Sequence, residues 1–103
     1  MKFERTPRFD NDFKVLLRER QDQFRDLVPQ FNAACDAYVA DPGGFTWPAA
    51  LRVSRMTRAK GIWEMTWSFN SPDGRATFEF VAVEGEQRVR WRRIGHHGIY
   101  KSP

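Results

Sequence analysis

Two adjacent histidines near the end of the chain are the first candidates for chemistry. His96 and His97 are the only histidines of the 103 residues, and they lie between Gly95 and Gly98. Histidine exchanges protons near neutral pH, and a carboxylate or guanidinium beside it would suit acid–base catalysis. The alternative is a pair of exposed histidines in a turn. Because no cysteine or third histidine lies at ligand spacing, we expect neither a metal nor another cofactor.

Alternating polarity in two predicted strands indicates which side chains share a face of a sheet. Residues 62–69 alternate between large apolar and polar side chains, so Glu64 is expected opposite the aromatic face. By the same rule, Arg75 and Glu79 lie on the polar side of residues 75–83. This face would bring carboxylates and guanidiniums together. The structural alternative for Glu64 is a cross-strand ion pair worth about 0.2–1 kcal/mol.

Positive charge is concentrated in the same half of the chain. The net charge is +4, and residues 51–103 contain ten Lys and Arg against five Asp and Glu, whereas residues 1–50 contain seven against eight. Eight of those ten basic residues are arginines, which bind phosphate with two donors and stack on bases. This pattern favours a nucleic-acid partner, with a solvated basic surface as the alternative. Three of the arginines alternate with apolar residues in the last predicted strand: Arg88, Arg90 and Arg92.

Apolar spacing predicts the helical elements that must hold these groups in place. A short strand is expected at residues 3–6, and apolar residues then recur at three- and four-residue intervals through residues 9–38. Charged residues at 18–22 interrupt this stripe. Pro29 lies inside it, and because proline removes a helical hydrogen bond it either kinks a second helix or separates two abutting helices.

The period of the pattern changes from about 3.6 to 2 in the second half, which predicts strands. They are expected at residues 51–55, 62–69, 75–83 and 87–94, with tight turns at residues 70–74 and 84–86. We therefore predict a single α+β domain over residues 1–103, in which an N-terminal helical hairpin packs on a three- to four-stranded antiparallel sheet. The sheet face away from the helices is left for function.

Composition excludes secreted and membrane proteins. The single Cys35 cannot form an internal disulfide, and residues 1–7 lack the apolar core of a signal peptide. Because no stretch approaches about 18 apolar residues, a membrane span is not expected. These features predict a protein that folds unaided in the reducing cytoplasm.

The order of elements and three segments resemble the RelE/HigB-like branch of the RelE/ParE toxin superfamily. Residues 61–67 read Gly-Ile-Trp-Glu-Met-Thr-Trp, and residues 73–78 read Asp-Gly-Arg-Ala-Thr-Phe. Residues 93–100, which end in Tyr100, are similar to the segment after the last strand in such toxins. The element order resembles the family over nearly the whole chain, whereas the sequence does so specifically only over residues 51–80.

The resemblance implies the toxin of a type II toxin–antitoxin system, with a cognate antitoxin, the ribosome and mRNA as partners. Many such toxins cleave mRNA in the ribosomal A site, where the RNA 2′-hydroxyl attacks the adjacent phosphate without a metal. Carried over to this sequence, Glu64 would be the base, Arg75 the phosphate stabiliser, and His96 or His97 the acid. Tyr100 would stack on a base or orient the phosphate.

Further basic residues are implied as contacts to the RNA backbone: Arg55, Lys60, Arg90, Arg93 and Lys101. The sequence departs from the family pattern at two positions, because several relatives have lysine in place of Glu64 and an arginine where a histidine occurs here. Two other functions therefore stay open. One is a non-enzymatic, ParE-like gyrase inhibitor, and the other is a protein that binds only its antitoxin or nucleic acid.

Overall fold

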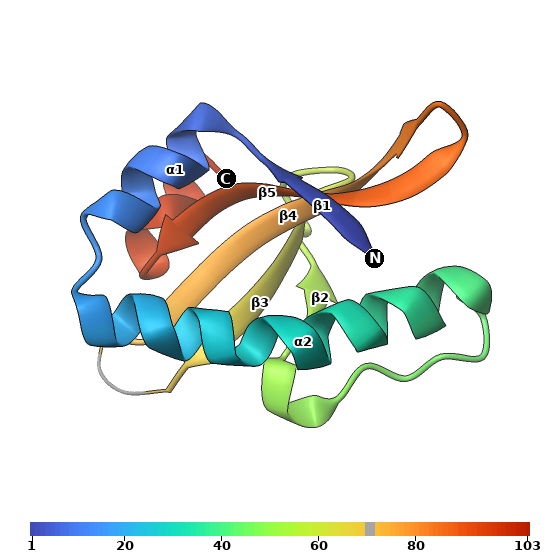
Figure 1. The fold of residues 1–103 in the computed structure, drawn as a ribbon, viewed down its shortest axis with the longest axis horizontal. Helices are drawn as coiled ribbons and strands as arrows, with labels where there is room; N and C mark the ends of the chain where they lie inside the picture. Colours follow the sequence, from blue (N-terminus) through green and yellow to red (C-terminus); the bar gives the residue numbers. More distant parts are fainter. Residues whose placement is uncertain (70–71) are drawn as a thin grey trace.

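The computed structural model describes residues 1–69 and 72–103, which form two α-helices and a five-stranded sheet (Figure 1). The strands are β1 (Lys2–Arg5), β2 (Ser54–Arg55), β3 (Trp63–Ser68), β4 (Gly74–Val83) and β5 (Glu86–Gly95). The helices are α1 (Pro7–Lys14) and α2 (Arg18–Ala40), and two 3₁₀ turns are η1 (Ala49–Leu51) and η2 (His97–Lys101). Neither helix of this described part is long and apolar enough to cross a bilayer.

The sheet is mixed, with the strand order β1-β5-β4-β3-β2. Strands β2 to β5 are antiparallel neighbours, whereas β1 runs parallel to β5 and pairs Phe3 with Val89. The predicted antiparallel strands are present as β2 to β5, but the prediction of three or four strands is incomplete, because β1 adds a fifth strand that is parallel to β5. No turn links β1 to its partner, because the two strands lie at opposite ends of the chain, so local patterns could not pair them.

The predicted helical hairpin is confirmed only as two helices, which pack on different parts of the sheet. α1 lies along β5 and α2 packs on β3. The Thr6 hydroxyl caps α1 by accepting the Phe9 N–H over 3.1 Å, and the Thr6 N–H donates to the Trp91 carbonyl over 3.0 Å. Pro7 occupies the first turn, where its missing N–H costs nothing. α1 is therefore fixed to β5 from its first residue.

α2 is one continuous helix through Pro29, which is exposed. Residues 18–22, predicted as an interruption, form its first turn. The strand predicted at residues 51–55 is also shorter, because its beginning forms η1 and only β2 pairs with β3. The turn predicted at residues 84–86 is confirmed by the positive φ angles of Glu84 and Gly85, 52° and 80°. The turn predicted at residues 70–74 includes residues 70 and 71, which lie outside the described residues.

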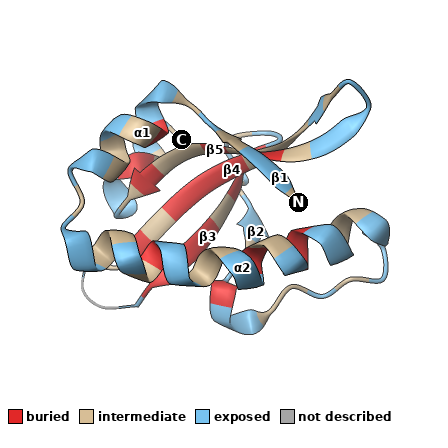
Figure 2. Ribbon diagram, in the orientation of Figure 1, coloured by how far each residue is buried: buried red, intermediate tan, exposed pale blue. Residues whose placement is uncertain are grey.

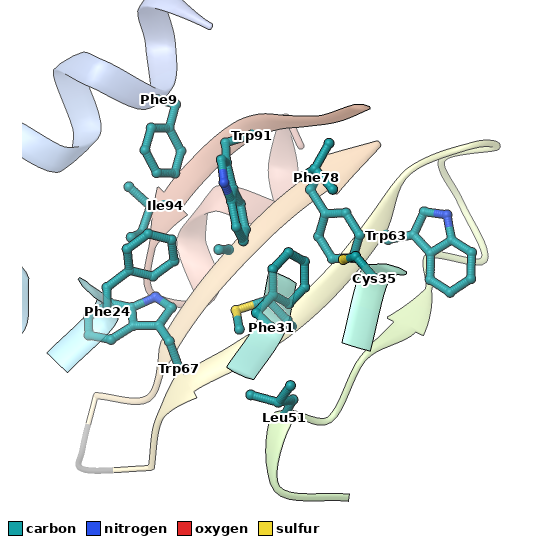
Figure 3. Close-up of a cluster of buried hydrophobic side chains, with 13 residues drawn as sticks. Phe9, Phe24, Phe31, Cys35, Leu51, Trp63, Trp67, Phe78, Trp91 and Ile94 are labelled. Carbon is teal, nitrogen blue, oxygen red and sulfur yellow. The ribbon is translucent and has the colours of Figure 1, made fainter. Parts of the chain in front are cut away.

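One aromatic core fills the space between the helices and the sheet (Figures 2 and 3). Trp91 lies at its centre, with ring centroids 5.8 Å from Phe9, 5.1 Å from Phe24, 4.8 Å from Phe31 and 5.6 Å from Phe78. Burial of each such side chain contributes about 1.5–3 kcal/mol. The helices thus cover one face of the sheet and leave its other face for different contacts.

Candidate functional site

Glu64 and Arg75 lie on the sheet face turned away from α2, which we call the open face. The aromatic residues of β3 and β4 point into the core, so the alternating polar residues point to the other side. Glu64 is paired with Thr77 and Arg75 with Thr66. The carboxylate and the guanidinium are therefore diagonal neighbours on adjacent strands.

The turn η2 brings Tyr100 onto the open face. η2 contacts both β4 and β5, and Ile99 is buried there. A Cβ atom at Gly95 would lie 3.0 Å from the Ile99 Cγ2 atom, so glycine leaves room for this side chain. Beyond η2, the Thr77 hydroxyl donates to the Pro103 carbonyl over 3.0 Å. Tyr100 is held between these two anchors.

The Tyr100 hydroxyl lies within electrostatic reach of Glu64 and Arg75. Burial raises its pKa above the usual value for tyrosine, the negative charge of Glu64 raises the pKa further, and the Arg75 guanidinium acts in the opposite direction. Because an ordinary tyrosine titrates only near about pH 10, Tyr100 is neutral at physiological pH. Its hydroxyl can therefore donate a hydrogen bond to an anionic ligand.

Three buried polar atoms on the open face have no hydrogen-bonding partner among the described residues: the Thr66 hydroxyl, the Arg75 Nε and the Tyr100 hydroxyl. In the same part of the chain, Asn32 Oδ1 of α2 is the other buried side-chain atom of this kind. Leaving a buried polar group unpaired costs about 1–3 kcal/mol, so most such groups are paired. Three unpaired atoms together indicate a site whose hydrogen bonds are completed by water or a ligand.

The Arg75 side chain is already oriented. Its Nη2 donates to the Asp73 Oδ2 over 3.2 Å, and the side chain is 18% exposed. The Nε remains available, so the guanidinium can bind an anion without first losing conformational freedom.

A groove of about 670 Å³ extends from Glu64 and Tyr100 toward the loop between β2 and β3. Lys101 and Arg58 are among its lining residues and supply positive charge. The Ser54 hydroxyl donates to Glu64 Oε1 over 3.3 Å at the same wall. Arg75 lies on the next strand and does not line this groove. The groove is therefore suited to a polyanion that reaches the Glu64 and Tyr100 pair from one end.

The two histidines have different surroundings. The His97 ring lies 5.1 Å from the Tyr100 ring, centroid to centroid, and the side chain is exposed. The His96 Nδ1 instead accepts the Gly98 N–H over 3.2 Å and caps the start of η2. The structure thus places His97 beside Tyr100 within η2, although His97 does not line the groove that contains Glu64, and it gives His96 a local role in the turn.

The sequence matches no family model and no curated protein. The structure is similar to that of a YoeB/ParE toxin from Agrobacterium tumefaciens, with a TM-score of 0.55 over 94% of this chain and 99% of that chain. The chain has the YoeB/ParE toxin fold. The two sequences are only 15% identical, so this likeness concerns the fold. The fold implied by the resemblance to RelE/ParE toxins is therefore confirmed, with the corrections to the sheet and helices given above.

Within this YoeB/ParE fold, two arginines predicted to bind phosphate are paired with acidic residues of the first half. The Arg90 Nε donates to Glu4 Oε1 over 2.6 Å, across β1 and β5. The Arg93 Nε donates to Asp12 Oδ2 of α1 over 2.7 Å. Reasoning from the sequence missed both carboxylates, because strand alternation predicts which face a residue occupies but not which distant element packs beside it.

The other three residues predicted to contact phosphate are Arg55, Lys60 and Lys101, and they do not all line the groove. Arg55 lies at the groove wall, but its Nη2 donates to the Tyr38 hydroxyl over 3.3 Å and its guanidinium carbon lies 4.9 Å from the Trp63 ring centroid. Lys60 is exposed in the loop between β2 and β3. Of the five, Arg55 and Lys101 line the groove and form no ion pair within the described residues.

The chemistry available at this site is proton transfer and anion binding. Among residues 1–69 and 72–103, His, Cys, Asp and Glu side chains do not form a group of three or more that could hold a metal ion. Thr66, Ser54 and Arg58 were not among the predicted site residues. No sequence signal marked them, because Ser54 and Arg58 are recognised only as lining residues of the groove, and Thr66 only by its buried, unpaired hydroxyl.

Proposed function

We propose that this chain is the toxin of a type II toxin–antitoxin system, a member of the RelE/ParE superfamily that cleaves mRNA on the ribosome without a metal ion. The observation that supports this function best is the meeting of Glu64, Arg75 and Tyr100 on the open face of a YoeB/ParE fold. A carboxylate, a guanidinium and a neutral phenol supply the base and the hydrogen-bond donors that transesterification of RNA requires.

In the proposed reaction the RNA 2′-oxygen attacks the adjacent phosphorus, and the bond from phosphorus to the 5′-oxygen breaks. Glu64 accepts the proton of the 2′-hydroxyl, and His97 donates a proton to the departing 5′-oxygen. The products are a 2′,3′-cyclic phosphate and a 5′-hydroxyl. We assign the acid to His97 because its ring lies beside Tyr100, whereas the His96 Nδ1 is occupied by the Gly98 N–H.

Arg75 and Tyr100 stabilise the charge that develops on the phosphate oxygens. The Arg75 Nε and the Tyr100 hydroxyl are buried donors without partners in the described residues, and they are held in place before the substrate arrives. Donors fixed in this way do not reorganise during the reaction, and the loss of one typically lowers kcat by about 10²–10³-fold.

The proposed partners follow from the charges around the groove. Lys101 and Arg58 would contact the backbone of the RNA strand that enters it. The toxin would act in the cytoplasm on mRNA held by the ribosome, and a cognate antitoxin would inhibit it. The proposal needs no cofactor, because the base, the acid and the phosphate donors are all side chains of this chain.

The test is induced expression of the protein in bacteria, together with cleavage of mRNA on purified ribosomes. The parent should arrest growth and cleave mRNA, and co-expression of the adjacent antitoxin gene should relieve the growth arrest. Arg75→Ala should abolish both the growth arrest and the mRNA cleavage, while its circular dichroism spectrum stays unchanged. Arg88→Ala is the matched control, because Arg88 lies on the same sheet face but is paired with Glu86 over 3.1 Å.

Three outcomes would count against parts of this proposal. A parent that does not impair growth would contradict the toxin function. Growth arrest by both the parent and Arg75→Ala, with mRNA left intact, would favour the non-enzymatic, ParE-like function instead. Equal loss of cleavage in Arg75→Ala and Arg88→Ala would mean that general positive charge matters, and not the Arg75 donor.

A further inference from the structure

Arg93 joins three parts of the fold that are distant in sequence. Its Nε and Nη2 donate to the Asp12 carboxylate of α1 over 2.7 and 3.2 Å, and its Nη1 donates to the Ser102 carbonyl over 3.0 Å. All three nitrogens of the guanidinium thus make hydrogen bonds within the protein. Asp12 Oδ2 also accepts the Ile94 N–H over 3.2 Å, at the edge of β5 beyond its pairing with β1.

This arrangement holds the end of η2. Ser102 follows η2 directly and donates its N–H to the Ile99 carbonyl over 3.1 Å. Its hydroxyl accepts a hydrogen bond of 3.1 Å from Arg8, which like Asp12 belongs to α1. The Asp12–Arg93 pair therefore links α1 and β5 to the segment that carries Tyr100, without lining the groove beside Glu64.

The pair is shielded and has the geometry of a specific contact. The Arg93 and Asp12 side chains are 17% and 19% exposed, and the guanidinium meets both carboxylate oxygens. Two parallel hydrogen bonds between ions fix the orientation of both partners, which a lysine at the same position cannot do. To bind a phosphate, Arg93 would first have to break both hydrogen bonds to Asp12.

We propose that Asp12 and Arg93 are a positioning pair that sets where Tyr100 lies over Glu64 and Arg75, and that Arg93 does not contact RNA. This replaces the expectation that Arg93 binds the RNA backbone. The RNA part of the test rests on the proposed function, whereas the part that follows Tyr100 does not.

The two roles for Arg93 predict opposite effects of losing Asp12. If Arg93 contacted phosphate, the Asp12 carboxylate would compete with RNA, and Asp12→Asn would strengthen RNA binding. If the pair positions η2, Asp12→Asn releases the same restraint as Arg93→Lys, and both variants weaken the site. Because Asn has nearly the same shape as Asp, Asp12→Asn distinguishes the two roles of Arg93 even if Arg93→Lys were to unfold the protein.

The first experiment follows the Tyr100 hydroxyl directly by NMR titration of protein labelled on tyrosine rings. Only two tyrosines are present, so Tyr38→Phe assigns the Tyr100 signal. Asp12→Asn and Arg93→Lys should each lower the Tyr100 pKa toward about 10, the value of an exposed tyrosine, because η2 moves away from the sheet. The double variant should shift the pKa no further than the larger single shift, because the two residues act as one unit.

Arg90→Lys is the matched control for this titration. It alters another arginine of β5 with a short ion pair, 2.6 Å from Glu4, and this pair joins β5 to β1, not to η2. The control should leave the Tyr100 pKa unchanged. An unchanged Tyr100 pKa in both Asp12→Asn and Arg93→Lys, or an equal shift in Arg90→Lys, would overturn the positioning role.

The second experiment measures binding of a short single-stranded RNA at several salt concentrations, and cleavage of mRNA on purified ribosomes. Asp12→Asn should bind no more tightly than the parent and cleave at least several-fold more slowly, and Arg93→Ala should keep the parent's salt dependence. Tighter binding by Asp12→Asn, or a salt slope reduced by about one in Arg93→Ala, would identify Arg93 as a phosphate contact and refute the proposal. If the parent neither binds this RNA nor cleaves mRNA on purified ribosomes, the proposed function fails, and the Tyr100 titration still decides the positioning role.

Discussion

The Trp67 indole nitrogen donates a hydrogen bond of 3.0 Å to the backbone carbonyl of Arg75. A buried core residue of β3 thus fixes the backbone of the residue that carries the proposed phosphate donor. Gly74 packs against the Trp67 ring, and a Cβ atom at Gly74 would lie 2.5 Å from the nearest ring atom. Core packing and site geometry are therefore joined at the start of β4.

Gly74→Ala should destabilise the protein and lower its activity. The added methyl group would meet buried ring atoms that cannot move freely, and such overpacking costs about 1–3 kcal/mol. Thermal unfolding should occur at a midpoint several degrees below that of the parent. Gly43→Ala is the control, because no atom lies within 4 Å of its added Cβ, and equal midpoints for the two variants would contradict the packing argument.

Tyr100→Phe should abolish most activity without loss of stability. The hydroxyl is buried and makes no hydrogen bond of good geometry in the described part of the chain, so its removal eliminates a desolvated group at little cost in stability. The free energy of unfolding in urea should be unchanged or higher, whereas mRNA cleavage should fall by about 10²–10³-fold.

Tyr38→Phe makes the matched comparison. It removes a hydroxyl that accepts a hydrogen bond of 3.3 Å from Arg55, outside the open face. This variant should lose up to about 1 kcal/mol of stability and keep its activity. If Tyr100→Phe were instead the less stable and more active of the two variants, the Tyr100 hydroxyl would have a structural role.

Glu64→Gln should lower the pKa of Tyr100. The Glu64 carboxylate disfavours the phenolate, so removal of its negative charge makes ionisation easier. Ultraviolet or NMR titration measures this shift in the folded protein. Glu79→Gln is the control, because Glu79 is on the same face but is paired with Arg92 over 2.6 Å, and it should leave the Tyr100 titration unchanged. An equal shift in both variants would mean that Glu64 has no special proximity to Tyr100.

The buried thiol of Cys35 should make stability fall at alkaline pH. Burial raises the pKa of this thiol to about 12, whereas in the unfolded chain it titrates near 9.0. Folding therefore favours the protonated form, and the contribution is complete below about pH 9. As the pH rises toward 12, the unfolded state loses the proton first, and stability falls by up to about 1.4 kcal/mol per pH unit.

Chemical denaturation between pH 8 and 11 should reveal this slope in the parent. Cys35→Ala serves as the reference, because all other titrating groups are retained and their contributions cancel in the difference. Identical pH dependence in the two proteins would contradict a thiol that is kept protonated by burial. A thiol reagent should likewise modify Cys35 only after unfolding.

The local patterns of the sequence predicted the antiparallel hairpins and the residues that share their polar face. Glu64 and Arg75 could be placed together because strand alternation depends on adjacent residues, and β3 and β4 are neighbours in the chain. The resemblance to RelE/ParE toxins also indicated the fold that the structural comparison found.

Contacts between distant segments were decided only by the tertiary structure. The parallel pairing of β1 with β5 and the ion pair of Arg93 with Asp12 each join residues that no turn or alternation connects. The same packing distinguishes His97 from His96, which are identical in type and adjacent in sequence. Sequence periodicity specifies a face, whereas the partner of each side chain on that face depends on which elements the hydrophobic core brings together.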